Sequence, residues 1–158
     1  MIYLGIDPGL SGAVSAILPD GRLFVTDTPV AVVKKTRRDY LVGEMAAVLR
    51  GLWDRNQNAC AALERGIAMP RQSSSTTYTT GRGGGLWEGI LAALGIPYEL
   101  VDSRKWKKEM GLPPGADKGA SRVLASRLFP ESAQFFARAK DDGRAESALI
   151  AEYRRRIG

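Results

Sequence analysis

The 158-residue sequence contains no histidine and only one cysteine. The lack of histidine excludes catalysis by Ser-His-Asp or Cys-His groups, and it removes histidine as a metal ligand. Cys60 is the single cysteine, so no intrachain disulfide can form, which fits a reducing compartment. It lies in the apolar stretch "CAAL" without a neighbouring base, as a small core residue would. Acid–base or metal chemistry must therefore come from carboxylates, lysine, tyrosine or bound water.

The sequence also lacks any hydrophobic run that approaches the roughly 18 residues of a membrane-spanning helix. No basic segment followed by an apolar one precedes the first strand-like stretch, so we expect neither a signal peptide nor a transit peptide. These absences predict a cytoplasmic protein, and the following charge balance predicts that it associates with DNA.

Positive charge dominates the composition. Lysine and arginine number 23 against 17 aspartate and glutamate residues, which gives a net charge of +6 and a pI of about 9.7. A basic balance of this kind favours a polyanionic partner such as nucleic acid, although a merely soluble basic protein would show it too. The length suits one compact domain, and we expect residues 1–158 to form a single domain without linkers or repeats.

Hydrophobic periodicity predicts an α/β fold with one mixed sheet. The expected strands are residues 2–7, 12–18, 22–28, 60–64 and 98–102, and the expected helices are residues 38–56, 86–95, 103–111, 118–129 and 142–156. Short links make strands one to three antiparallel, whereas helical connections make the fourth and fifth strands parallel. Residues 29–36 and 65–85 are expected to be loops. The simplest arrangement places the first strand at the centre, beside the fourth, with helices flanking the sheet.

Two apolar strands end in a carboxylate, Asp7 and Glu64. The parallel arrangement brings both to the same edge of the sheet, where open α/β sheets bind ligands. A lone buried charge costs several kcal/mol, so each of these acids needs a compensating partner. Each acid also has a purely structural interpretation, because Asp7 could cap the turn that follows it and Glu64 could pair with Arg65.

The last predicted helix carries two more acids in an unusual place. Counted at about 100° per residue, Asp142 and Glu146 fall within the apolar stripe that contains Leu149 and Tyr153. Asp142 alone could be a helix cap. Four converging acids repel one another unless cations intervene, and oxygen-only ligands suit Mg²⁺ or Mn²⁺. We therefore favour a metal site, at which two ions could assist phosphoryl displacement, over four structural acids.

The stretches "GIDPGLSG", "ALE" and "DDGRAESALIA" resemble the three acidic motifs of the RuvC family of Holliday-junction resolvases. The resemblance extends from Ile2 to Tyr153 and implies a ribonuclease-H-like fold. It also implies an endonuclease that resolves four-way DNA junctions by paired, symmetric phosphodiester hydrolysis with water as the nucleophile. The cofactor implied is Mg²⁺, two per active site, with Mn²⁺ as a substitute, and no nucleotide cofactor is expected.

The same resemblance implies that Asp7, Glu64, Asp142 and Glu146 are the catalytic residues and metal ligands. The best-known bacterial form places the last two ligands three residues apart and usually ends in Asp, whereas here they are four apart, with Gly143 at the three-residue position. Phage-type and organellar relatives look more similar in this respect. The spacing leaves Asp141 or Asp142 as the ligand, and we favour Asp142 because it shares the apolar stripe with Glu146.

A basic segment follows the fifth predicted strand. "WKKEMG" and the later Lys118 resemble the family segment in which two lysines approach the cleaved phosphate, which implies roles for Lys107 and Lys118. A cation in the first turn of a helix opposes the helix dipole, and a bound phosphate would explain Lys118 there. We expect Lys118 to assist catalysis by stabilising the charged transition state. The predicted DNA contacts in this segment are Lys105, Lys107, Lys108, Lys118 and Arg122.

The long predicted loop 66–85 corresponds to a family region that reaches into the junction centre. Within it, Arg71, Tyr78 and Arg82 are expected to contact DNA, with Tyr78 stacking on a base, although an exposed tyrosine without a role would look the same. The amides of Gly83–Gly85, placed before the next helix, could hold a phosphate.

A two-fold symmetric junction needs two active sites, so we expect a homodimer, with helix 86–94 as a candidate interface. Three alternatives stay open. The first motif also resembles the phosphate hairpin of actin-like ATPases, which need two such domains. The others are a catalytically inactive nucleic-acid-binding module of the same fold and a nuclease that acts on RNA–DNA hybrids.

Overall fold

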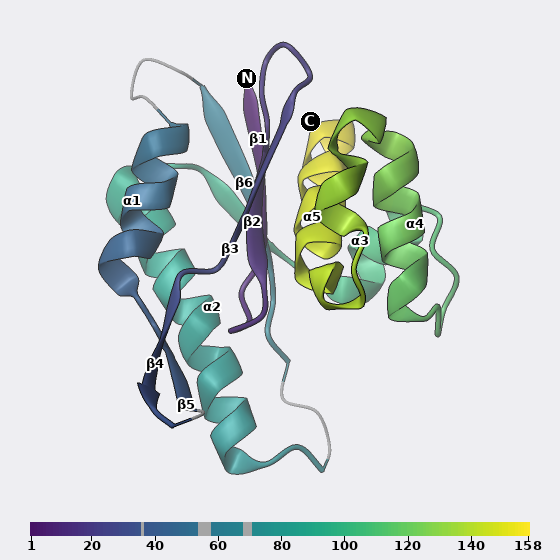
Figure 1. The fold of residues 1–158 in the computed structure, drawn as a ribbon. Helices are drawn as coiled ribbons and strands as arrows, with labels where there is room; N and C mark the ends of the chain where they lie inside the picture. Colours follow the sequence, from purple (N-terminus) through teal and green to yellow (C-terminus); the bar gives the residue numbers. More distant parts are fainter. Residues whose placement is uncertain (36, 54–57, 68–70) are drawn as a thin grey trace.

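The structure is a computed structural model that describes residues 1–35, 37–53, 58–67 and 71–158. Its centre is a five-stranded sheet in the order β3-β2-β1-β6-β7 (Figure 1). The strands are β1 (Ile2–Asp7), β2 (Ala13–Ile17), β3 (Leu23–Asp27), β6 (Ala59–Glu64) and β7 (Tyr98–Val101). The pairs β1–β2 and β2–β3 are antiparallel, while β1–β6 and β6–β7 are parallel. The predicted mixed sheet, with β1 at its centre, is confirmed.

Helices cover both faces of this sheet (Figure 1). One face carries α1 (Val42–Leu52) and α2 (Ser74–Leu94), and the other carries α3 (Ser103–Glu109), α4 (Lys118–Leu128) and α5 (Asp142–Ile157). Each face has its own hydrophobic core, one around Trp87 and one around Trp106. Among the described residues, no helix is both long enough and apolar enough to cross a membrane.

Helix α5 packs directly on β1 and β2 because the residues between them are small. A side chain at Gly5 would overlap the backbone of Ser147 and Ala151. The hydroxyls of Ser15 and Ser147, both buried, lie 2.7 Å apart and satisfy each other. This close approach sets the height of α5 over the sheet, and it brings the first turn of α5 to the end of β1.

The prediction of a loop at 29–36 and a helix from Arg38 is wrong. The structure has a separate two-stranded hairpin there, β4 (Val30–Lys34) and β5 (Arg37–Tyr40), and α1 begins only at Val42. Predicted helix residues 54–56 lie outside the described residues. β-Branched residues in β4 favour a strand. Tyr40 ends the hairpin in the core, where its hydroxyl donates to the Pro8 carbonyl at 3.2 Å and to the Thr79 carbonyl at 3.1 Å.

The predicted loop 65–85 is also wrong from residue 74 onward, because α2 begins at Ser74 and continues to Leu94. Ser73 caps it by accepting a hydrogen bond from the Thr76 amide at 3.1 Å. Glycine is a poor helix former, but Gly83 allows a close approach, since a side chain there would overlap Tyr40 and the Pro8 carbonyl. The Gly83–Gly85 amides lie inside the helix, so the predicted phosphate site at a helix start is wrong.

Two short 3₁₀ helices, η1 (Pro130–Phe136) and η2 (Ala139–Asp141), lead into α5, where the sequence pattern predicts no regular structure. The remaining helices start where the sequence places them. Asp117 caps α4 by accepting from the Ala120 amide at 2.9 Å, as predicted. The first residue of α5 is Asp142.

Candidate active site

Asp7 ends β1 at the carboxyl edge of the sheet and is largely buried. The only hydrogen bond described for its carboxylate is a long one, 3.4 Å, from the Gly9 amide. Burial, together with the negative charges of Glu64 and Glu146, raises the pKa of Asp7 from 3.8 to about 7. An acid in this setting favours a proton or a nearby cation.

Glu64 ends the neighbouring parallel strand β6. The indole N–H of Trp106, a fully buried residue of α3, donates a 2.6 Å hydrogen bond to Glu64 Oε2. Burial raises the pKa of Glu64, while the hydrogen bond from Trp106 acts in the opposite direction. Glu146 raises this pKa as well, so Asp7, Glu64 and Glu146 form one electrostatically coupled group. Trp106 orients the Glu64 carboxylate within that group.

The first two turns of α5 supply the other acids, and each faces a cation. Lys107 Nζ lies 2.9 Å from Glu146 Oε1, and Arg122 Nε lies 3.0 Å from Asp142 Oδ1. The second contact lacks the alignment of a hydrogen bond. About a fifth to a quarter of the Glu146 and Asp142 side chains is exposed, so both can be reached from solvent.

Gly143 explains why these acids are four residues apart. Its α-carbon faces Asp7, and a β-carbon there would lie 3.1 Å from Asp7 Oδ2 and overlap the Ser11 carbonyl. No side chain fits at the position three residues before Glu146. The carboxylate in the first turn of α5 belongs to the neighbouring Asp142, and the contact described for it is with Arg122.

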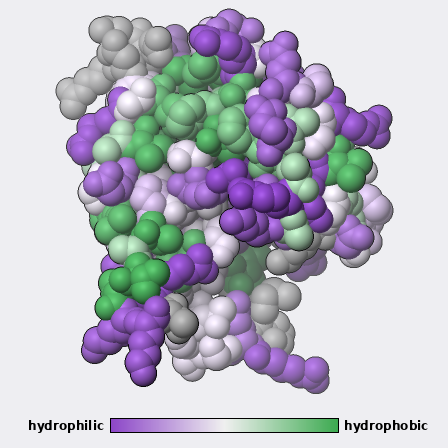
Figure 2. Space-filling model, in the orientation of Figure 1, coloured by the Kyte–Doolittle hydropathy of each residue, from purple (hydrophilic) through white to green (hydrophobic). Residues whose placement is uncertain are grey.

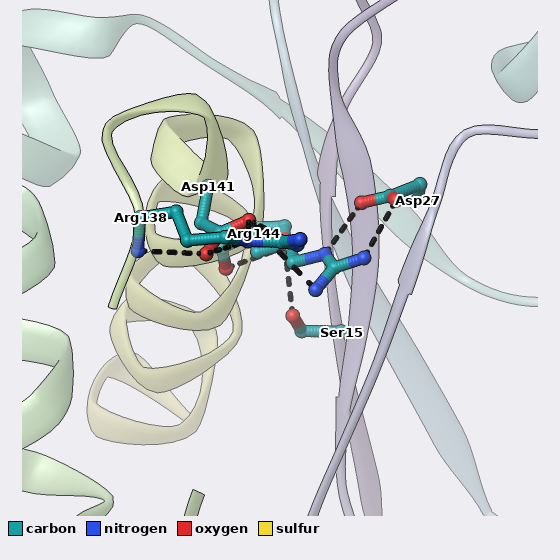
Figure 3. Close-up of polar contacts among 6 residues, drawn as sticks. Ser15, Asp27, Arg138, Asp141 and Arg144 are labelled. Carbon is teal, nitrogen blue, oxygen red and sulfur yellow. Dashed lines mark hydrogen bonds and ion pairs between the residues drawn. The ribbon is translucent and has the colours of Figure 1, made fainter. Parts of the chain in front are cut away.

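Asp141 has different partners from Asp142 (Figure 3). Both of its oxygens accept hydrogen bonds from Arg138, and Arg144 approaches at 3.8 Å. The Arg138 guanidinium holds the pKa of Asp141 below its usual range. Arg144 also forms two hydrogen bonds with Asp27 of β3, at 2.6 and 2.7 Å. Asp141 thus fastens η2 and α5 on the β3 side of the sheet, away from Glu64.

The chemistry of the four acids fits a hard divalent cation. They offer oxygen donors alone, and burial and neighbouring acids raise the pKa values of Asp7 and Glu64, an effect that a bound cation would oppose. Over the described part of the chain, no three acidic or sulfur-bearing side chains already stand close enough to bind one ion. Lys107 and Arg122 instead occupy the α5 acids. Metal binding would therefore require these two cations to give way.

The predicted DNA contacts on α3 lie around this group. Lys105 and Lys108 are exposed, and the Lys105 ammonium sits 5.7 Å from the ring centre of Tyr153. Lys107 sits 5.1 Å from the ring centre of Trp106 while it pairs with Glu146. Lys118 is the first residue of α4, and its side chain lies outside what the structure describes.

The contacts predicted near α2 divide into two kinds. Tyr78 is 71% exposed on α2, and Arg71 is exposed just before it, with a left-handed backbone (φ 69°). Arg82 instead forms an ion pair with Asp39 of β5 and lies 5.6 Å from the Tyr40 ring centre. Arg82 therefore joins α2 to the hairpin. Its side chain is already paired, which weakens the prediction that it contacts DNA.

Trp106 and Gly143 are the site residues that the sequence patterns do not reveal. Trp106 reads as an ordinary core residue, and only its position next to Lys107 in a basic helix hints at more. Gly143 has no signal beyond its place between two acids. Both roles depend on contacts between elements far apart in the chain.

The chain is similar to known proteins in sequence and in structure. No family model matches the chain. In sequence, it is 33% identical over 85 residues to the chloroplastic Holliday junction resolvase MOC1 of Chlamydomonas reinhardtii, a match over 54% of this chain but 10% of that protein. In structure, it matches Thermus thermophilus RuvC with a TM-score of 0.61 at 17% identity, and RuvC in complex with a Holliday junction substrate with 0.62 at 19%.

Both structural matches cover 100% of this chain and 97% of the RuvC chain. The likeness to RuvC thus extends over the whole chain, whereas the likeness to MOC1 concerns a small part of a much longer protein. The predicted resemblance to RuvC is confirmed in fold, and over 85 residues the sequence is similar to that of a Holliday junction resolvase.

Proposed function

We propose that this chain is a metal-dependent endonuclease that resolves four-way DNA junctions by paired, symmetric cuts. The observation that carries the proposal is the coupled group of Asp7, Glu64 and Glu146 at the carboxyl edge of the sheet, with cations beside it. The names of the similar proteins, a Holliday junction resolvase and RuvC bound to a junction, support four-way DNA as the substrate.

Asp7, Glu64, Asp142 and Glu146 would hold the metal in this proposal. Mg²⁺ is the expected ion, two per site, with Mn²⁺ as a substitute. When bound, such ions neutralise charge on the scissile phosphate and promote ionisation of the attacking water. We place Asp142 rather than Asp141 in the set, because Arg138 already satisfies both oxygens of Asp141.

The protein's own groups prepare this site. Trp106 fixes the orientation of Glu64, so that an oxygen ligand is in position before substrate arrives. Lys107 and Arg122 balance the α5 acids in the free protein. Once released from those acids, both can turn to the phosphates of DNA, and we assign Lys118 to the same task at the cleaved phosphate.

Three wider features belong to the proposal. Two copies of the chain would act as a homodimer, since a two-fold junction presents two strands to cut. The 158 residues would form one nuclease domain. A cytoplasmic, DNA-associated location stays a prediction of the sequence.

Cleavage of a labelled four-way junction in Mg²⁺ tests the proposal. Wild type should produce paired symmetric nicks in the junction but should leave a linear duplex and an RNA–DNA hybrid intact. Asp7→Asn should bind the junction without cutting it, and Asp20→Asn, an exposed acid in the β2–β3 turn, should cut like wild type. Preferential cleavage of the hybrid would assign the site to hybrid nuclease activity. Tight binding by wild type without cleavage in Mg²⁺ or Mn²⁺ would make the protein a junction-binding module.

A further inference from the structure

The β4–β5 hairpin is a basic arm beside the candidate active site that the proposed chemistry does not use. It carries Lys34, Lys35, Arg37 and Arg38 within five consecutive positions. We infer that this hairpin is a second contact for the DNA phosphate backbone, and that it holds an arm of the junction on the β3 side of the site. The inference rests on the proposed function, because it extends the same DNA surface.

The charge of the hairpin is available to a ligand. Lys34, Lys35 and Arg37 are exposed, and none forms an ion pair with any residue that the structure describes. The acid of the hairpin, Asp39, is already neutralised by Arg82 of α2. The tip thus presents cations without internal anions, which is the arrangement that binds phosphates.

Strand β5 of the hairpin is fastened to the segment that follows Asp7. The Arg38 guanidinium donates to the Leu10 carbonyl at 3.3 Å and to the Ser11 hydroxyl at 3.0 Å. At the other end of β5, the Tyr40 hydroxyl donates to the Pro8 carbonyl. A phosphate bound on the hairpin would therefore have a defined position relative to the catalytic edge.

A basic hollow continues the arm toward α5. This cavity, of about 410 Å³, lies at the base of the hairpin, and its lining includes Arg38, Arg138, Lys140 and Arg144. Its two acids, Asp27 and Asp141, are both engaged by arginines. Arg138 and Arg144 are the cations that neutralise these acids, so Arg38 and Lys140 remain in excess, and the hollow also favours an anion.

The hairpin and the hollow lie on one side of β1, whereas Glu64, Lys107 and Trp106 lie on the other. Asp27 belongs to edge strand β3, and Glu64 belongs to β6, so the two groups flank the end of the central strand. A nuclease that binds a branched substrate needs contacts on both sides of the cut. The hairpin and the hollow would provide the contacts on the β3 side, with a separate stretch of the DNA backbone.

Two features of the tip fit a surface kept for binding rather than for stability. Lys35 has a left-handed backbone, φ 44°, at a turn position where Gly or Asn is usual. Val32 and Val33 are 65% and 49% exposed beside the lysines. Figure 2 shows this hydrophobic patch next to hydrophilic residues where Figure 1 places β4 and β5, at the lower left. Charge complementarity favours DNA as the partner.

The test compares two charge-matched double variants. Lys34→Gln/Lys35→Gln removes two cations from the tip, and Arg22→Gln/Arg50→Gln removes two exposed cations near the opposite end of β1. Junction affinity is measured without cleavage, in Ca²⁺, over a range of salt concentrations. We expect the tip variant to bind roughly tenfold more weakly and to lower the slope of log affinity against log salt by about 2. The matched variant should behave like wild type.

Each outcome has one meaning. Equal affinities and slopes for both variants would overturn the inference, while wild-type binding and cleavage would leave the proposed function intact. Unchanged junction affinity together with loss of self-association would assign the hairpin to contact between copies and would also overturn it. A wild-type protein that neither binds nor cuts junctions would refute the proposed function instead.

Discussion

Two neighbouring aspartates at the start of α5 belong to opposite kinds of carboxylate groups. Asp141 is almost fully buried, and Arg138 satisfies both of its oxygens, which lowers its pKa. Asp142, one residue later, lies 3.0 Å from Arg122 of α4 instead, and we group it, as a proposed metal ligand, with Asp7 and Glu64, acids whose pKa values burial raises. The first group is a structural clamp in which arginines match each acid. The second retains excess negative charge.

The contrast teaches that the number of acids in a region does not identify a site. Each group has a buried or half-buried aspartate at the start of α5, Asp141 in the first and Asp142 in the second. What separates them is how fully the folded chain supplies the counter-charge. Arginines match both acids of the first group, whereas in the second group Arg122 and Lys107 pair with Asp142 and Glu146 and leave Asp7 and Glu64 without an ion pair among the described residues. Four predictions can sharpen or break this contrast.

The largest difference should appear in catalysis. Asp7→Asn is expected to lower the rate of junction cleavage by about 1,000-fold, since it removes a ligand at the reacting phosphate. Asp141→Asn should leave the rate within about threefold of wild type, provided that it is measured well below its melting temperature. Single-turnover assays at saturating protein make the comparison. Equal losses in both variants would show that the clamp and the site act as one unit.

The free energy of unfolding should fall in Asp141→Asn, the variant that keeps its activity. Asp141→Asn is expected to lower the free energy of unfolding by about 3 kcal/mol, because it breaks a buried ion pair and leaves Arg138 without its partner. Asp20→Asn removes an exposed ion pair with Arg22 and should cost less than about 1 kcal/mol. Urea denaturation at pH 7 measures both. A similar small loss for the two variants would mean that the clamp contributes little.

Asp7→Asn should stabilise the metal-free protein by about 2 kcal/mol at pH 8. Asp7 has a pKa of about 7 in the folded protein against 3.8 ordinarily, so between these values the folded state holds a proton that the unfolded chain has lost. Wild-type stability should consequently fall as the pH rises through this window, and the variant should lack that component. Urea denaturation in EDTA from pH 4 to pH 8 tests this, and a gap between the proteins that does not change with pH would refute it.

The smallest effect concerns the orientation of Glu64. Trp106→Phe removes the indole hydrogen bond and should lower cleavage about tenfold while the junction is still bound. Trp87→Phe is the matched control, because Trp87 is equally buried in the other core and its indole nitrogen has no hydrogen-bond partner among the described residues. A loss restricted to Trp106→Phe, with a shifted Mg²⁺ dependence, would mark Trp106 as a positioning residue. Equal losses of cleavage in the two variants would show that both tryptophans act only by packing in the core.

The candidate site was open to prediction because its signals are local. Asp7 and Glu64 each end an apolar strand, and Asp142 and Glu146 interrupt the apolar stripe of one helix. The hairpin and the first half of α2 were not open to prediction in this way. The glycines in α2 argue against a helix, and only Gly83, packed against Tyr40 and Pro8, shows what they are for. In both segments, tertiary packing outweighs the local conformational preference of the residues.

By itself, the amino-acid sequence determined the five strands of the central sheet, their order and the acids at its edge, since strand and helix periods and short links leave few other arrangements. Only the tertiary structure decided which partner each acid has. Asp141 and Asp142 are adjacent and chemically identical, and a turn of about 100° between them sends one to Arg138 and the other to Arg122. Charge balance depends on neighbours brought together by folding, and no local pattern encodes it.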